Sequence, residues 1–252
     1  MDATQLFSSK ATLYAAHRWD YAPAAIDALI ETTGLRPGDL VADIGAGTGM
    51  LARHFAERGF MTVAVEPNTA MRAIAEHDLN RYANFRSIDA RSAATGLPDR
   101  SVALLAVGRA LHWLPAESTR AEFLRILKPQ GWLTIMGVSC ADATLTDALE
   151  TTRTTESGWD ITNSKANRPP LTMSSYYGGD HFQELHFPGV EEETWDQFCG
   201  RMLSFSPAPD VGSDGYDRYV RSLKAVFDRF AVQGRIVIPV STDVALGQLL
   251  RA

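Results

Sequence analysis

VADIGAGTGML, residues 41–51, places three glycines at alternate positions directly after a short apolar run. The residues that follow, as far as Arg58, have the mixed apolar and polar pattern of an amphipathic helix. Glycine is needed where the backbone takes a positive φ or approaches a ligand closely, and the first turn of a helix presents unpaired N–H groups. The stretch therefore predicts a strand, a glycine-rich turn and a helix that together bind a ligand.

The spacing of the glycines, GxGxG, distinguishes this loop from two other nucleotide-binding loops. A dinucleotide loop prefers GxGxxG, and here Met50 occupies the place of its third glycine. A phosphate-binding P-loop ends in Gly-Lys-Ser or Gly-Lys-Thr, and no such ending follows. A tight turn that binds no ligand is the remaining alternative, which the preceding strand and the following helix disfavour.

Two acidic residues come at the ends of the next two expected strands. Glu66 lies about 20 residues after the glycine loop, where a carboxylate can accept hydrogen bonds from both hydroxyls of a ribose. That arrangement suits NAD and other nucleoside cofactors equally. Asp89 follows the third strand, where its side chain can meet an adenine amino group or, alternatively, only form an Asx turn.

The sequence from Asp39 to Val138 alternates short apolar runs with amphipathic stretches, which predicts βαβ units and a parallel sheet. We expect Asn68 to cap the second helix and a turn at 128–131 to lead into the fifth strand. The expected strands are 40–44, 60–65, 85–88, 101–107 and 132–138, and the expected helices are 49–58, 69–77 and 117–127.

This alternation ends after Cys140. Residues 144–156 have the pattern of a helix, and 158–179 predict an irregular cap. Further on, the run Glu191-Glu192-Glu193 should begin a solvated helix. Regular elements return with expected strands at 182–187 and 236–242 and expected helices at 193–203 and 216–232. The predicted fold class is α/β, a doubly wound, mostly parallel seven-stranded sheet with a helical cap.

Four parts of the chain follow from this pattern. Residues 1–34 are an N-terminal helical lid element, and 35–140 are the cofactor-binding α/β core. Residues 141–180 are a cap insertion, and 181–252 complete the sheet and supply helices on the substrate side.

Composition and charge disfavour several classes of function. A formal net charge of −6 without a basic stripe argues against nucleic acid as a partner. No window holds the roughly 18 apolar residues of a membrane span, and the N-terminus lacks an apolar signal region, so we expect a cytoplasmic protein without a membrane partner. Cys140 and Cys199 lack metal-ligand spacing, and His181 and His186 would face opposite sides of a strand, so no metal site is predicted.

From about Phe7 to Val138 the chain resembles class I S-adenosylmethionine-dependent methyltransferases, particularly the small-molecule group related to trans-aconitate methyltransferases. The resemblance rests on five motifs in order, VADIGAGTG (41–49), VAVEPN (63–68), IDARSAATGLPDRSVALL (88–105), ALHWLP (110–115) and LKPQGWL (127–133). It implies S-adenosylmethionine as the cofactor.

The resemblance also implies which residues bind that cofactor. The aspartate and glycines of the loop hold its amino-acid end, Glu66 holds the ribose, Asp89 and Ala90 the adenine, and Gly108 lies beside the methionine part. The N-terminal YAAHRWDY (14–21) is similar to a YxxxRPxYP element that supplies a tyrosine and an arginine near the cofactor carboxylate, with tryptophan here in place of proline. The full implied set is Tyr14, Arg18, Asp43, Gly45, Ala46, Gly47, Gly49, Glu66, Pro67, Asp89, Ala90 and Gly108.

The acceptor site of such a fold lies above the carboxyl ends of the strands, near the loop after the fourth strand. In that loop His112 is the candidate general base or acceptor-orienting residue, or a histidine that only hydrogen-bonds the loop. Arg109 is a candidate clamp for a substrate carboxylate or, alternatively, a surface arginine. Trp113 and Tyr21 complete the expected substrate contacts.

We therefore expect methyl transfer to oxygen, nitrogen or carbon of a small-molecule acceptor, by a monomer or homodimer. Two alternatives remain at this point. One is a protein that binds S-adenosylmethionine or its demethylated product without catalysis, and the other is an NAD-linked oxidoreductase, which the glycine spacing and Asp89 disfavour.

Overall fold

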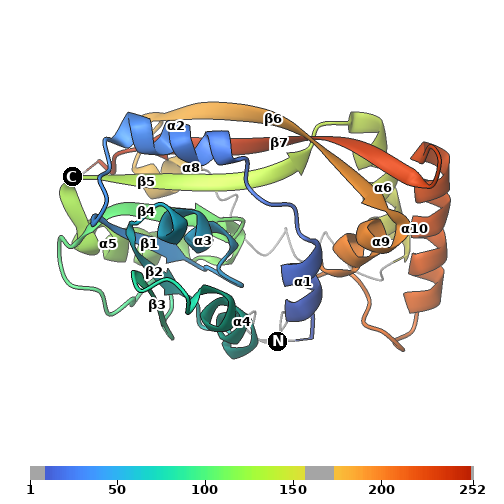
Figure 1. The fold of residues 1–252 in the computed structure, drawn as a ribbon, viewed down its shortest axis with the longest axis horizontal. Coiled ribbons are helices and arrows are strands. Elements are labelled where there is room, and N and C mark those ends of the chain that lie inside the picture. The colour runs from blue at the N-terminus through green and yellow to red at the C-terminus, as the bar shows by residue number, and fades with distance from the viewer. Residues whose placement is uncertain (1–8, 157–172, 251–252) are drawn as a thin grey trace.

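The computed structural model of the protein describes residues 9–156 and 173–250. These residues form a seven-stranded sheet in the order β3-β2-β1-β4-β5-β7-β6 (Figure 1). Strands β1 to β5 are parallel, whereas β7 pairs antiparallel with both β5 and β6, which confirms the expected mostly parallel sheet. The strands are β1 (Leu40–Ile44), β2 (Met61–Val65), β3 (Phe85–Ile88), β4 (Val102–Gly108), β5 (Leu127–Cys140), β6 (Phe182–Thr194) and β7 (Arg235–Gly247).

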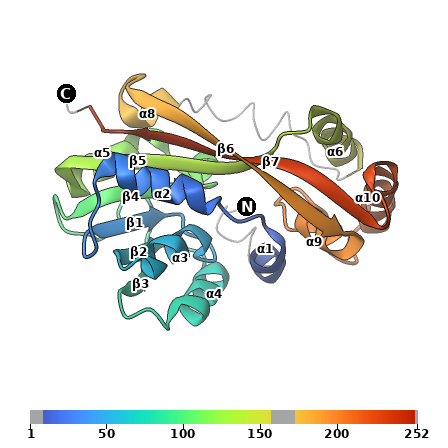
Figure 2. The ribbon, with the colours of Figure 1, turned by 45° about the horizontal axis from the view of Figure 1, so that its top comes forward.

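Helices cover both faces of the parallel part of the sheet, because its strands are apolar on both sides (Figure 2). On one face α2 and α3 pack through residues such as Leu29 and Phe55, and on the other α5 and α8 pack through Phe123 and Tyr176. The helices are α1 (Ala11–His17), α2 (Pro23–Thr33), α3 (Met50–Glu57), α4 (Thr69–Leu79), α5 (Ala116–Ile126), α6 (Ala143–Glu156), α8 (Met173–Tyr177), α9 (Trp195–Leu203) and α10 (Tyr216–Phe230), with a 3₁₀ turn η1 (Leu111–Trp113).

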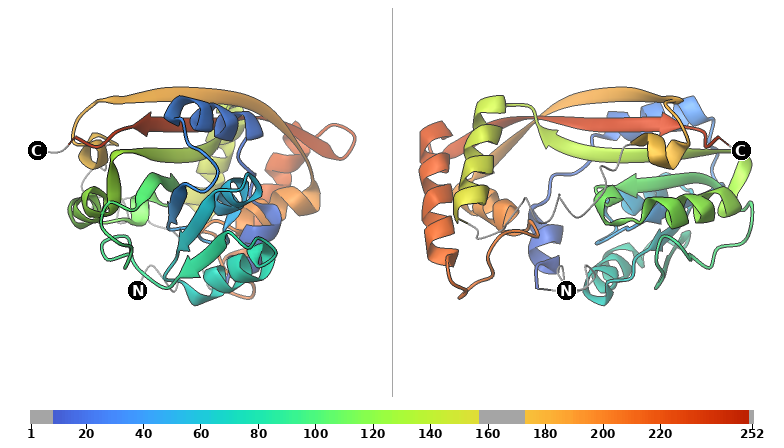
Figure 3. Two further views of the ribbon diagram at one scale, coloured as in Figure 1. Left: turned by 60° about the vertical axis from the view of Figure 1, so that its left-hand side comes forward. Right: turned by 180° about the vertical axis from the view of Figure 1, so that it is seen from behind.

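A separate hydrophobic cluster lies where β5, β6 and β7 extend beyond the parallel strands. Along β7 the side chains of Ile236, Ile238 and Val240 alternate with exposed residues and face this cluster. Leu223 and Phe227, one turn apart on α10, pack against it, and α6 lies beside α10 (Figure 3). The long strands thus carry a helical layer at the end of the molecule away from α5.

Two local expectations differ in outcome. Asn68 caps α4 as predicted, because its side chain accepts a hydrogen bond from the backbone N–H of Met71 at 2.9 Å. The turn expected at 128–131 instead lies inside β5, which already pairs with β4 at Leu127 and pairs again from Trp132. The four residues between form an irregularity in the register of the strand.

The expectation that the glutamate run begins a helix was wrong. Residues 191–193 lie in β6 and pair with 236–238 of β7, because the β-branched run of β7 extends the antiparallel ladder as far as Thr194. Helix α9 begins only after Thr194, whose side chain forms a capping box with Gln197. Glu193 is also buried rather than solvated.

The segments expected to be a cap and a lid each divide into parts that pack in different places. In the expected cap, α6 packs with α10, whereas α8 packs with α5 against the main sheet, and 157–172 lies outside the described residues. In the expected lid, α2 lies on the sheet near β6 and β7, and α1 sits between α4 and α9. Residues 1–8 also lie outside the described part.

Candidate functional site

The carboxyl ends of β1, β2 and β4 open onto a cavity of about 520 Å³. The loop after β1 forms part of its wall through Gly45 and Gly47, which have φ values of +70° and +56°. A Cβ on Gly45 would approach that of Ala110 to 2.7 Å, whereas one on Gly47 would meet no atom within 4 Å. Gly47 therefore leaves its backbone open toward the cavity, in a conformation that other residues rarely adopt.

Glu66 stands on the cavity wall at the end of β2. Its Oε2 accepts a hydrogen bond from the backbone N–H of Gly47 and its Oε1 one from that of Asn68, each at 2.8 Å. Burial raises the pKa of this carboxyl, while the two backbone donors act in the opposite direction. Since each carboxylate oxygen has a second acceptor position, the fixed side chain can still receive two ligand hydroxyls.

Asp43, at the carboxyl-terminal part of β1, is almost inaccessible, with 1% of its surface exposed. Its Oδ2 accepts a hydrogen bond from the backbone N–H of Ala52 in α3 at 3.0 Å, which ties the strand to the helix that follows the glycine loop. Among the described residues its Oδ1 has no hydrogen-bond partner. Burial raises the pKa of Asp43 to about 7.

The N-terminal helix reaches the cavity through Tyr14 and Arg18. The guanidinium carbon of Arg18 lies 3.6 Å from the ring centroid of Phe205 and 4.8 Å from that of Tyr14. Burial lowers the pKa of Arg18 to about 10. Phe205 and the adjacent Ser206, which also line the cavity, follow α9.

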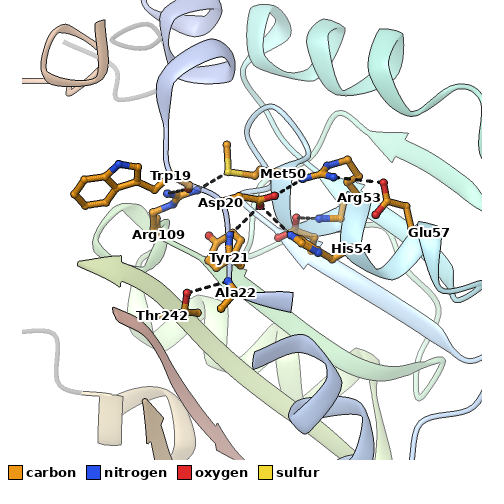
Figure 4. Close-up of polar contacts among 12 residues, drawn as sticks. Trp19, Asp20, Tyr21, Ala22, Met50, Arg53, His54, Glu57, Arg109 and Thr242 are labelled. Carbon is orange, nitrogen blue, oxygen red and sulfur yellow. Dashed lines mark hydrogen bonds and ion pairs between the residues drawn. The ribbon is translucent and has the colours of Figure 1, made fainter. Parts of the chain in front are cut away.

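The loop after β4 brings Gly108 and Arg109 to the same cavity. Arg109 has a φ of +57°, an uncommon value for a residue with a side chain. Its guanidinium donates hydrogen bonds to the carbonyl oxygen of Trp19 and to the Sδ of Met50, both at 2.8 Å, and lies 4.7 Å from the ring centroid of Tyr21 (Figure 4). The side chain of Arg109 is therefore held by other segments at the cavity wall, and its role as a substrate clamp stays a prediction.

His112 and Trp113 belong to η1 and also line the cavity. Their ring centroids are 4.9 Å apart. The imidazole therefore has access to the space that Gly47 and Glu66 also border, as a general base or an orienting group requires.

The cavity gathers most of the residues singled out in the sequence. Those on its wall are Tyr14, Arg18, Gly45, Gly47, Glu66, Pro67, Ala90, Gly108, Arg109, His112 and Trp113. Asp43, Ala46, Gly49 and Tyr21 lie behind or beside the wall. Asp89 is off the wall too, because its carboxylate is largely exposed and pairs with Arg72 at 3.1 Å.

Several wall residues had no signal in the sequence. Val138 near the end of β5, and Phe205 and Ser206 after α9, are brought to the cavity by strand order and by the packing of α9 beside α1. Arg91, Ser92 and Ala93 follow Ala90 in the same loop and also line the cavity, next to the residues expected to meet an adenine.

In the parts of the chain that the structure describes, no group of three or more histidine, cysteine or acidic side chains is arranged to hold a metal ion. Across 9–156 and 173–250, no helix combines the length and the apolar character needed to cross a membrane.

The arrangement fits a nucleoside cofactor. An open glycine turn, a fixed carboxylate at the end of the second strand and a buried carboxylate oxygen without a partner can receive the polar groups of a nucleoside joined to an amino acid. By fold the chain is therefore an α/β protein, and the cavity at the carboxyl ends of its parallel strands has the features that such a cofactor requires.

Residues 42–135 match the family described as "Methyltransferase domain". An uncharacterised methyltransferase of Mycobacterium tuberculosis is 34% identical over 134 residues, which are 52% of this chain and 51% of that protein. The matched region thus spans about half the length of the first curated relatives.

Solved structures extend the likeness of the fold to nearly the whole chain. One from Anaeromyxobacter dehalogenans, described as a type II methyltransferase, has a TM-score of 0.64 at 21% identity and covers 94% of this chain and 100% of its own. Phosphoethanolamine N-methyltransferase 2 of Haemonchus contortus, in complex with phosphomonomethylethanolamine and S-adenosylhomocysteine, has a TM-score of 0.54 at 14% identity and covers 98% of this chain and 58% of its own.

Residues 42–135 thus match a methyltransferase domain, and the fold of nearly the whole chain resembles that of methyltransferases of known structure. None of the relatives described above is a trans-aconitate methyltransferase, and that narrower resemblance stays a prediction.

Proposed function

We propose that the protein transfers the methyl group of S-adenosylmethionine to oxygen, nitrogen or carbon of a small-molecule acceptor. The observation that carries the proposal is the joint presence, on one cavity of about 520 Å³, of the glycine loop, Glu66 and the loop with His112. A cavity of this size is in the range of small-molecule sites, and its wall combines a few polar groups with aromatic side chains.

The residues of the glycine loop and Glu66 are the proposed cofactor contacts. The backbone around Gly47 would approach the amino-acid part, Glu66 would accept hydrogen bonds from the ribose hydroxyls, and Asp43 would meet the ammonium group through its unpartnered Oδ1. When bound, the cofactor supplies an electrophilic methyl group on its sulfonium.

The protein's own contribution to the reaction is to hold the acceptor in line with that methyl group and to manage the acceptor's proton. His112 is the proposed residue for the second task, because a neutral imidazole nitrogen can take a proton near neutral pH. Trp113 and Phe205 would exclude water from the acceptor through their apolar rings.

The first test is the choice of cofactor. In calorimetric titrations we expect wild-type protein to bind S-adenosylhomocysteine and not NADH. We expect Gly47→Val to abolish binding of S-adenosylhomocysteine, because the new side chain occupies the open side of the loop and opposes its positive φ. Gly212→Val is a matched control, since Gly212 also has a positive φ and an open Cβ position but lies outside the cavity wall. Binding of NADH alone would refute the proposal.

The second test separates an enzyme from a protein that only binds the cofactor. Wild-type protein is incubated with a metabolite extract and cofactor labelled in its methyl group, and products are followed by mass spectrometry. We expect label in at least one small molecule. If S-adenosylhomocysteine binds but no fraction of any extract acquires label, the non-catalytic alternative replaces the proposal.

A further inference from the structure

Two arginines in the cavity wall, Arg18 and Arg109, have no acidic partner. Both line the cavity, and the Nε atom of each is shielded from solvent and without a hydrogen-bond partner. Among the described residues, no carboxylate lies within ion-pair distance of either guanidinium. Their neighbour Arg201 differs, because its Nε is 2.7 Å from Oε1 of Glu193.

The groups in direct contact with Arg109 are uncharged. Its guanidinium donates hydrogen bonds to a backbone carbonyl and to the sulfur of Met50, and it also interacts with the hydroxyl of Tyr21 (Figure 4). The rings of Tyr21 and Tyr14 lie 4.7 Å and 5.9 Å from its guanidinium carbon. The nearby carboxylate of Asp20 is engaged with Arg53 and with Nε2 of His54. Arg109 is thus held in place without a direct ion pair among the described residues.

The surroundings of Arg18 are aromatic. Its guanidinium stacks on Phe205 and lies over Tyr14, so cation–π attraction offsets part of the cost of removing the charge from water. A cation that is shielded in this way gains strongly from an anion, because their attraction increases as water is excluded. Each arginine also has guanidinium N–H groups left to donate.

The charges of the proposed cofactor do not balance both cations. S-adenosylmethionine carries one carboxylate, which can pair with one guanidinium, together with an ammonium and a sulfonium that add positive charge. Asp43 and Glu66, the buried acids nearest the glycine loop, hold backbone N–H groups and are the proposed partners of the ammonium and the ribose. One guanidinium then remains without an anion paired directly with it in the loaded site.

We propose, on the basis of the proposed function, that the methyl acceptor is an anion, and that Arg18 and Arg109 divide between them the cofactor carboxylate and the anionic group of the acceptor. A carboxylate or a phosphate provides the shared chemistry, since both accept the paired N–H groups of a guanidinium. A neutral or cationic acceptor would leave one guanidinium in the cavity wall without a directly paired anion, so the inference predicts that such metabolites are poor acceptors.

The direct test fractionates a metabolite extract on an anion-exchange column before reaction with wild-type protein and methyl-labelled cofactor. We expect label to form in the fractions that the column retains and releases with salt. Treatment of these fractions with alkaline phosphatase before the reaction distinguishes the two sources, because it removes a phosphate acceptor and leaves a carboxylate acceptor intact. Label confined to the unretained fraction would overturn the inference while leaving the methyltransferase proposal standing; failure to bind S-adenosylhomocysteine would instead overturn the methyltransferase proposal.

Variants then assign the two arginines. We expect one of Arg18→Gln and Arg109→Gln to weaken S-adenosylhomocysteine roughly tenfold or more, and the other to leave that affinity within about threefold while raising the KM of the anionic acceptor roughly tenfold or more. Arg221→Gln, on the exposed side of α10, is the matched control and should change neither value. If both variants retain wild-type KM for the acceptor, or if their only effect is on the cofactor, the assignment of an acceptor anion to this pair fails.

Discussion

At the scale of single residues, Asp43 near the end of β1 has a buried carboxyl whose ionisation lowers the stability of the fold. The carboxyl is fully enclosed, one of its oxygens has no partner among the described residues, and its pKa rises from the ordinary 3.8 to about 7. The folded protein therefore retains a proton that the unfolded chain has already lost at neutral pH. This contribution to stability is complete below about pH 4 and is lost as the pH rises to about 7.

Asp43→Asn should remove this pH dependence, because an amide keeps the hydrogen bond from Ala52 without ionising. At pH 8 the cofactor-free variant should be more stable than wild type by as much as about 4 kcal/mol, with the difference shrinking toward pH 4. The same variant should bind S-adenosylhomocysteine more weakly. Urea unfolding at several pH values measures the first effect, and parallel stability curves for the two proteins between pH 4 and 8 would contradict it.

His112 gives the second prediction at this scale. If it is a general base, His112→Ala should lower turnover roughly 10²-fold or more while leaving cofactor affinity nearly unchanged. If it only orients the acceptor, His112→Gln should retain most activity, since an amide can donate or accept a hydrogen bond but cannot take a proton at neutral pH. Single-turnover rates at several pH values separate the two roles. A near wild-type rate for the alanine variant would leave proximity as the main source of catalysis.

At the scale of elements, the end of β6 shows that one run of like charges can contain side chains with unlike roles. Glu193 is buried, pairs with Arg201 through two hydrogen bonds of 2.7 Å and 3.0 Å, and accepts a third from Nε1 of Trp19. Glu192, one residue earlier on the opposite face of the strand, only approaches exposed Arg235 at 3.3 Å. The contacts of Glu193 fasten α9, which carries Arg201, to the segment after α1, which carries Trp19.

Glu193→Gln should lower the free energy of unfolding by roughly 3 to 5 kcal/mol, because it leaves the charge of Arg201 buried and unpaired. Glu192→Gln is the matched control and should change it by less than about 1 kcal/mol, as is usual for an exposed ion pair. Chemical denaturation followed by tryptophan fluorescence measures both. Equal effects of the two substitutions would show that the Glu193 pair is not a stabilising contact.

At the scale of the whole molecule, the glycine loop and the hydrophobic cluster around α10 lie in different parts of the fold. The parallel strands hold the glycine loop and Glu66, whereas α6, α9 and α10 pack on the extensions of β5 and β7 (Figure 1). The cavity lies between these parts, since Phe205 and Ser206 reach it from the end of α9. We therefore expect substitutions in the cluster around α10 to weaken acceptor binding more than cofactor binding.

Phe227→Ala tests this division. Phe227 is 3% exposed, and its ring packs edge-on against Trp195 and at a tilt against Phe198. Its truncation should therefore lower the free energy of unfolding by roughly 3 to 5 kcal/mol. At a temperature where the variant is folded, we expect its affinity for S-adenosylhomocysteine to stay within about threefold of wild type and its acceptor KM to rise. A loss of cofactor affinity equal to the loss for the acceptor would mean that the two parts respond as one unit.

The sequence by itself determined the parallel core and the cofactor loop. Apolar runs, the GxGxG turn, the cap at Asn68 and the acid at Glu66 are local signals, because a strand, a helix start and a turn each depend on residues close together in the chain. The ends of β5, β6 and β7 were not determined in this way. Their length depends on pairing with strands far away in the sequence, and this pairing placed residues 191–193 in a strand.

Only the tertiary structure decided which side chains meet in the cavity and which of the charged ones have an ion-pair partner. Arg109 carries no sequence signal that separates a surface position from the enclosed one it occupies, because its environment comes from Trp19, Met50 and Tyr21 on other segments. Phe205 likewise reaches Arg18 through the packing of α9 beside α1. Burial and the absence of a counter-charge are properties of several segments at once, so no local pattern of residues could reveal them.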